Sequence, residues 1–132
     1  MKYRKITKYK YELMETLTEN VPIRGYVQTE FIELGDMSLT IREGYCWDGA
    51  SGPTIDTKST MRGSLVHDAL YQLMRMGKIG QEYKPLADQT FRRLIRADGM
   101  GVFRAWYYYN GVRFFGRKAA AVQQREPEVI DV

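Results

Sequence analysis

The first half of the chain alternates apolar and polar residues, which is the pattern of half-buried β-strands. Strands are predicted over residues 9–18, 26–34 and 37–42. Between the last two strands, Gly35-Asp36 predicts a two-residue hairpin turn, because glycine tolerates positive φ at the first central position. Gly44 ends the third strand or forms a bulge before a short extended stretch, residues 45–47. The N-terminal half is therefore expected to form an antiparallel sheet.

The second half changes to a helical period after a loop, residues 48–54, that contains glycine and proline. Helices are predicted from a cap at Asp56, Thr57 or Ser59 to Met76, from Pro85 to the glycine at 99, and over 102–115. Strands followed by helices predict an α+β fold, with an N-terminal antiparallel β-sheet and about three helices packed on it. Residues 1–118 are expected to form a single domain, and residues 119–132 a C-terminal extension or arm.

The third predicted helix is apolar or aromatic on nearly all sides, which is typical of a helix buried on most faces. Its run from Trp106 to Tyr109 points in four directions at about 100° spacing, so at least one ring is expected near the surface. Tyrosine and tryptophan commonly anchor protein interfaces. Self-association or attachment to a particle through this helix and the arm is therefore expected.

Composition narrows the class of protein. The 132 residues are 44% hydrophobic, which excludes an intrinsically disordered chain. A single cysteine excludes a disulfide framework and a multi-cysteine zinc site. No apolar run approaches the ~20 residues of a membrane span, so no membrane partner is expected.

Positive charge gathers in the C-terminal half. Residues 84–118 hold eight basic and two acidic residues, and the net charge of the whole chain is +4. Arg92, Arg93 and Arg96 share one face of the second predicted helix and are the candidate anion-binding residues. Weak nucleic-acid binding without sequence preference is one hypothesis for this face. A solvated helix face is the simpler interpretation.

Candidate chemistry gathers around residues 47–76. The catalytic hypothesis assigns Asp48, Ser51, His67, Asp68 and Asp88 to a small hydrolase that acts by acid–base or metal-assisted catalysis. His67 would serve as the base, with Ser51 as a nucleophile. The nucleophile elbow is incomplete, because proline occupies position 53 where that motif has glycine. No cofactor or metal site is predicted, and a divalent metal stays open within the hydrolase hypothesis.

A structural network explains most of the same residues and is the favoured interpretation. Asp48 would cap the Gly-Ala-Ser turn, and His67 would hydrogen-bond Tyr71 four residues later on one helix flank. Adjacent helical residues diverge, so His67 and Asp68 do not easily bind one ion. The two remaining aspartates would neutralise arginines of the third helix. This predicted network contains Asp48, His67, Asp68, Tyr71, Asp88, Arg104 and Arg113.

Four motifs in order carry a resemblance to a known family. They are Trp47-Asp48-Gly49-Ala50-Ser51-Gly52-Pro53, His67-Asp68-Ala69-Leu70-Tyr71, Ala87-Asp88-Gln89-Thr90-Phe91 and Tyr109 with Gly111-Val112-Arg113-Phe114-Phe115-Gly116. Together they resemble the bacteriophage- and prophage-associated family known as the domain of unknown function 1353. Gly52 departs from the aliphatic residue of many members. The resemblance implies a phage or prophage origin and no particular reaction.

Three functional hypotheses follow. The first is a non-catalytic phage protein, a virion or assembly component that contacts other phage proteins or itself. Its expected location is the virion or the cytoplasm of the infected bacterial host. The second is the small hydrolase, acting on cell-envelope material. The third is a weak nucleic-acid binder.

Overall fold

The fold is α+β, as the sequence predicts: in the computed structural model, seven strands precede three α-helices within the residues described, which are 1–6, 11–49 and 56–115. Ser51 and the predicted arm, 119–132, lie outside these residues. The strands are β1 (Tyr3–Lys5), β2 (Tyr11–Leu13), β3 (Leu17–Asn20), β4 (Tyr26–Gln28), β5 (Ile32–Gly35), β6 (Ser38–Ile41) and β7 (Cys46–Trp47). The helices are α1 (Lys58–Arg75), a 3-10 turn η1 (Gln81–Tyr83), α2 (Lys84–Ala97) and α3 (Val102–Phe115).

The strands form two antiparallel sheets, ordered β1-β2-β7 and β3-β6-β5-β4. Each of the first two predicted strands is therefore divided. A bend after Leu13 lets β2 join one sheet and β3 the other. Within the second predicted strand, Thr29 turns the chain, since its amide donates to the Ile32 carbonyl and its hydroxyl accepts from the Ile32 amide. Apolar alternation alone did not locate these breaks.

The predicted hairpin turn is wrong by one residue. Gly35 pairs with Ser38, so the turn residues are Asp36 and Met37, with φ of 41° and 73°. Register explains the shift, because it pairs Leu34 with Leu39 and places both side chains in the core. A slip by one residue would turn one of these faces toward solvent. Core packing therefore outweighs the φ preference of glycine here.

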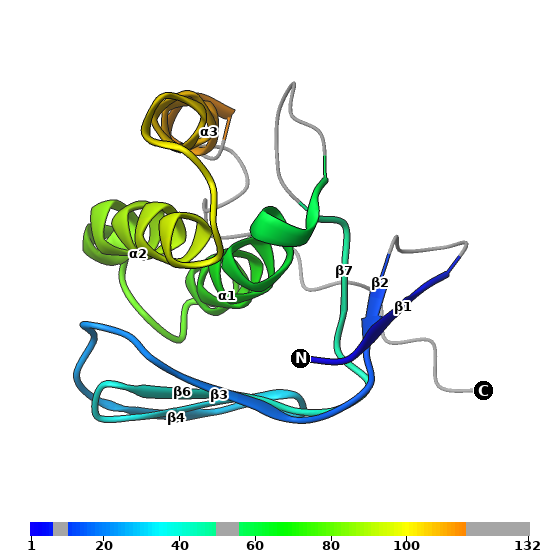
Figure 1. Cartoon of the computed structure of the whole chain (residues 1–132). Coiled ribbons are helices and arrows are strands. Elements are labelled where there is room, and N and C mark those ends of the chain that lie inside the picture. The colour runs from blue at the N-terminus through cyan, green and yellow to red at the C-terminus, as the bar shows by residue number, and fades with distance from the viewer. Residues whose placement is uncertain (7–10, 50–55, 116–132) are drawn as a thin grey trace.

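The molecule is layered (Figure 1): the four-stranded sheet lies beneath α1 and α2, and α3 lies on the far side of α2. The main core joins the sheets to α1, whose predicted apolar face is fully buried at Val66, Ala69, Leu70 and Leu73. At the α1–α2 contact, a Cβ on Gly63 would lie 2.8 Å from Ile95 Cγ2. Glycine thus allows α1 and α2 to approach closely.

The entry to α1 is fixed by local bonds. Thr57 is the N-cap and forms a capping box with Thr60, whose hydroxyl accepts from the Thr57 amide at 2.9 Å. Trp47 of β7 donates from Nε1 to Ser64 Oγ at 3.1 Å, which ties the strand to the second turn of the helix. Gly77, with φ of 70°, ends the helix as predicted.

Candidate functional site

A buried polar network joins α1 to α2. His67 Nε2 lies 2.7 Å from Asp88 Oδ1, and Tyr71 donates its hydroxyl to the same oxygen at 2.5 Å. Lys84 Nζ donates to Asp88 Oδ2 at 2.8 Å. Helical spacing brings these groups together, since His67 and Tyr71 are four residues apart on α1, as are Lys84 and Asp88 on α2.

The network is almost closed to solvent. His67 is 4% exposed and Asp88 is 1% exposed. The His67 ring lies against the rings of Tyr71, at a centroid distance of 4.0 Å, and Phe91, at 5.4 Å. A buried carboxylate with three donors is stable only while those donors stay in place. These buried hydrogen bonds connect α1 to α2.

Burial and hydrogen bonding oppose each other at this carboxylate. Burial raises the pKa of Asp88, but the hydrogen bonds from His67, Lys84 and Tyr71 outweigh it, and the net pKa lies below its ordinary value. Burial and the hydrogen bond to Asp88 raise the pKa of Tyr71 well above its ordinary value. Asp88 is therefore the anion of the network, and Tyr71 remains a neutral donor.

The predicted arginine partners are not those that the structure supplies. Lys84 balances Asp88, and its ammonium also donates to the Arg113 main-chain carbonyl at 3.3 Å. The Arg113 guanidinium instead lies over the Tyr109 ring, 5.6 Å from its centroid. Arg104 is exposed on α3. Lys84 was not predicted as a partner, because the predicted helix begins at Pro85, whereas α2 begins at Lys84 and places it four residues before Asp88.

Asp68 belongs to a second network on another side of α1. The Tyr45 hydroxyl lies 3.1 Å from Asp68 Oδ2 and 3.0 Å from Gln72 Oε1. Burial raises the pKa of Asp68, against the lowering effect of the Arg75 charge and of the Tyr45 hydrogen bond. Tyr45, Asp68 and Gln72 line a surface depression of about 520 Å³, and Asp48 lines it too.

The five residues of the catalytic hypothesis therefore do not form one site within the described residues. His67 and Asp88 lie in the buried network between α1 and α2, whereas Asp48 and Asp68 line the depression beside Tyr45. Ser51 lies outside the part of the chain that the structure describes. Among the described residues, no three His, Cys, Asp or Glu side chains are placed to hold a metal ion together.

The three arginines of the candidate anion-binding face have separate partners. Arg92 lies over the Tyr109 ring at 5.4 Å from its centroid. Arg93 donates to the Asn20 carbonyl at 2.8 Å, and Arg96 to that of Met100 at 2.9 Å. All three side chains remain exposed.

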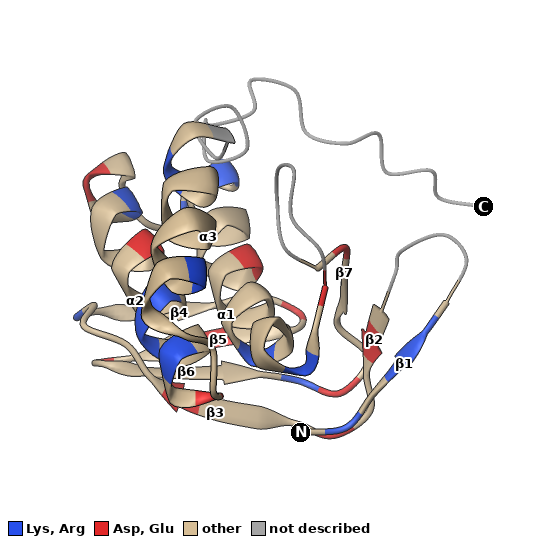
Figure 2. Ribbon diagram, turned by 45° about the horizontal axis from the view of Figure 1, so that its top comes forward, with Lys and Arg blue, Asp and Glu red and all other residues tan. Residues whose placement is uncertain are grey.

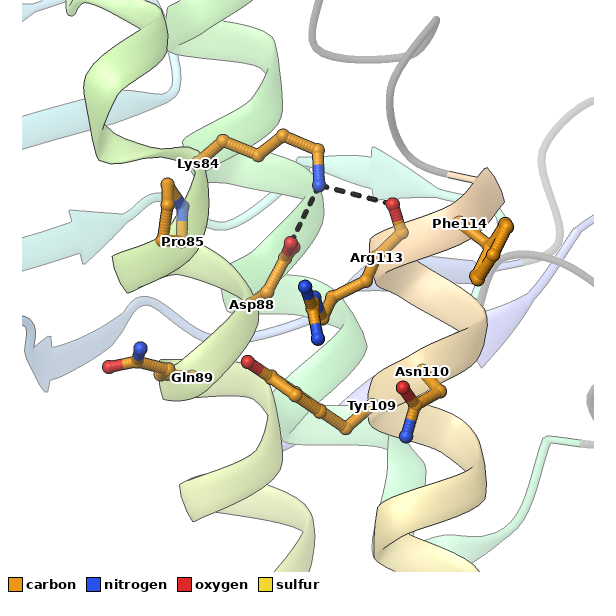
Figure 3. A pocket seen from close by; sticks show the side chains of 8 residues that line it. All are labelled: Lys84, Pro85, Asp88, Gln89, Tyr109, Asn110, Arg113 and Phe114. Atoms are coloured by element: carbon orange, nitrogen blue, oxygen red, sulfur yellow. Dashed lines mark hydrogen bonds and ion pairs between the residues drawn. The ribbon is translucent and has the colours of Figure 1, made fainter.

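A polar pocket of about 390 Å³ opens between the first turns of α2 and the last turns of α3 (Figure 3). From α2 it is lined by Lys84, Pro85, Asp88 and Gln89, and from α3 by Tyr109, Asn110, Arg113 and Phe114. This pocket was not predicted from the sequence, because it depends on how α2 and α3 cross.

The third helix is the clearest departure from the predicted burial. One side packs on α2 through Ala105, Tyr108 and Val112, and the opposite side is open to solvent. Phe103 is 90% exposed, Phe114 76% and Trp106 57%. We call the solvent-facing set the aromatic face; it consists of Phe103, Trp106, Tyr107 and Phe114. The helix is apolar on both sides, and only the side that faces α2 contributes to a hydrophobic core cluster of the described residues.

The fold and site define a small α+β domain with a buried His–Asp–Tyr network and a helix that exposes aromatic side chains on one side. Residues 27–112 match the family described as "Protein of unknown function (DUF1353)", and the chain belongs to this family. Neither a search of curated proteins nor a search of solved structures found a match. No helix in the described residues has both the length and the apolarity to cross a membrane.

Proposed function

We propose that this chain is a bacteriophage-encoded, non-catalytic protein that binds other phage proteins, in the virion or in an assembly intermediate. The observation that carries the proposal is the aromatic face of α3. Its four rings stand on the side of the helix opposite α2. Contiguous exposed apolar surface of this kind marks interaction sites, and Trp and Tyr are typical anchors. The phage origin is supported by the motif resemblance described above.

Positive charge borders the aromatic face of α3. The α3 sequence contains Arg104 and Arg113 and no acidic residue, so its ribbon carries blue segments and no red ones (Figure 2). On a helical projection at about 100° per residue, these arginines border the aromatic face on opposite sides. A partner with an apolar strip and acidic margins would match this surface.

The hydrolase hypothesis has less support from the geometry. Its base, His67, is buried, and its Nε2 is bonded to Asp88. A general base must reach a substrate proton directly or through one water. The exposed Asp48 lies in a different depression from Asp88.

The proposal is tested in the phage or induced prophage that encodes the chain. Wild-type protein should be found by mass spectrometry in purified particles or in isolated assembly intermediates. The double variant Phe103→Ser/Trp106→Ser should be reduced there at least tenfold, because it removes two anchors. Sedimentation of the isolated chain measures self-association in parallel.

Tyr26→Ser is the matched control, because Tyr26 is 83% exposed on β4 and lies outside the aromatic face. This variant should be incorporated like the wild type. The proposal would be contradicted if the wild-type chain were absent from particles and intermediates and sedimented as a monomer. Normal incorporation of the double variant would show that another surface is used.

A further inference from the structure

The polar pocket between α2 and α3 holds an unbalanced positive charge. Of its three charged side chains, Asp88 is paired with Lys84 at 2.8 Å, and its other oxygen accepts from His67 and Tyr71. Arg113 then remains, and no described carboxylate forms a salt bridge with its guanidinium. A pocket with one spare guanidinium favours an anion.

The pocket also offers hydrogen-bond donors. Figure 3 shows Arg113 reaching from α3 toward α2, between Asp88 and Tyr109. An ammonium has three donors, and two of those on Lys84 go to Asp88 and to the Arg113 carbonyl. Asn110 lines the α3 wall and donates one of its two amide hydrogens to the Trp106 carbonyl, and Gln89 lines the α2 wall with its amide directed away from Arg113 (Figure 3). Guanidinium and amide donors are groups that bind a carboxylate well.

The pocket adjoins the aromatic face. Phe114 belongs to both, and Asn110 stands one helical turn after Trp106, whose carbonyl accepts from the Asn110 amide at 2.8 Å. A ligand group held in the pocket would therefore lie beside a segment docked on the aromatic rings. The two features form one continuous surface with an apolar part and a cationic part.

We infer that the polar pocket binds the side-chain carboxylate of an acidic residue in the protein segment that docks on the aromatic face. The inference rests on the proposed function, because that function supplies the docked segment. Arg113 provides the charge, and the second amide hydrogen of Asn110 is a further donor to the carboxylate. Lys84 keeps Asp88 neutralised, so that the pocket does not repel the incoming anion.

The test uses the full chain, labelled with ¹⁵N, and N-acetyl-glutamate N′-methylamide as the probe. Saturable chemical-shift changes should appear at Gln89, Asn110 and Arg113, with a weak affinity, because the probe forms one ion pair at an open site. The matching glutamine compound, which lacks the charge, should cause no saturable change. Equal shifts with both compounds would overturn the inference.

Variants of Arg113 and Arg104 distinguish binding in the pocket from a general effect of positive charge on α3. Arg113→Gln should weaken probe binding roughly fivefold or more, and Arg113→Lys should restore part of it. The Lys84 contact is to the Arg113 main chain, so both variants keep it. Arg104→Gln is the matched control, because Arg104 is an exposed arginine of the same helix outside the pocket. Equal effects of Arg104→Gln and Arg113→Gln would contradict the assignment.

Two further titrations distinguish a carboxylate from a phosphate ligand and test the pocket independently of the aromatic face. Inorganic phosphate is titrated under the same conditions, and saturable binding of phosphate without binding of the glutamate probe would overturn the carboxylate assignment. The probe has no apolar group, so Phe103→Ser/Trp106→Ser should bind it like the wild type. Loss of particle incorporation in that double variant with no probe binding in the wild type would reject the pocket and leave the proposed function standing.

Discussion

The pKa values of the two buried aspartates Asp68 and Asp88 are shifted in opposite directions. Three donors lower the pKa of Asp88 despite its burial, whereas burial raises the pKa of Asp68. The stabilising contribution of Asp88 is therefore complete above its unfolded pKa of about 3.9 and is lost as pH falls through the lower folded pKa. For Asp68 the sign is reversed, and stability is lost as pH rises through the folded pKa.

Replacing each carboxyl by an amide should separate these roles. Asp88→Asn should lower the free energy of unfolding at pH 7 by roughly 2–4 kcal/mol, because Lys84 loses its buried counter-charge. Asp68→Asn keeps an acceptor for Tyr45 and removes the cost of a buried charge. It should change stability by less than about 1 kcal/mol at pH 7. Urea unfolding at pH 7 and at pH 4 measures both, and equal losses at pH 7 would refute the distinction.

The sequence predicted the positions of some side chains on α1 correctly. Helical periodicity put His67 and Tyr71 on one flank and Asp68 further round the helix, and the structure has both arrangements. The cations could not be assigned in the same way. Which cation reaches Asp88 depends on the crossing of α1, α2 and α3, and periodicity within one helix contains no information on that crossing.

Among the elements, the contact of α1 with α2 depends on Gly63. Alanine there would gain about 1 kcal/mol of helix propensity. The added methyl would meet Ile95 Cγ2 at 2.8 Å and the Phe91 carbonyl at 3.3 Å, and overpacking typically costs about 1–3 kcal/mol. We expect Gly63→Ala to lower the melting temperature by several degrees, as measured by thermal unfolding.

Gly101→Ala is the control for this substitution. A Cβ at Gly101 would meet nothing within 4 Å, and its φ lies outside the strained region. Its melting temperature should stay close to that of the wild type. A stabilised Gly63→Ala protein would mean that α1 and α2 separate slightly at no cost.

The helices were easier to predict than the strands. Caps and glycines mark helix ends chemically, and the predicted third helix has the bounds of α3, Val102–Phe115. Strand breaks depend on which sheet a strand joins, and that is decided by partners distant in sequence. The burial of α3 was overestimated for a related reason: an apolar helix face indicates a contact but not whether the contact is within the same chain.

For the molecule as a whole, weak nucleic-acid binding stays a prediction. Arg92, Arg93 and Arg96 each have an intramolecular partner and remain exposed, so any phosphate contact would be shallow. With about three phosphate contacts, affinity should fall on the order of tenfold to hundredfold between about 50 and about 200 mM salt. Charge reversal at Arg92 and Arg96 should abolish binding in a fluorescence anisotropy titration. Tight binding that persists at high salt would indicate a dedicated nucleic-acid site.

The described residues form two hydrophobic clusters, which connect different elements. The larger one joins the sheets to α1, and the smaller one only attaches α3 to α2. The aromatic face belongs to neither, so its side chains can be exchanged with little effect on folding. The proposed function therefore implies that such proteins can change their binding partner through substitutions on one side of one helix, while the core that holds the fold together stays the same.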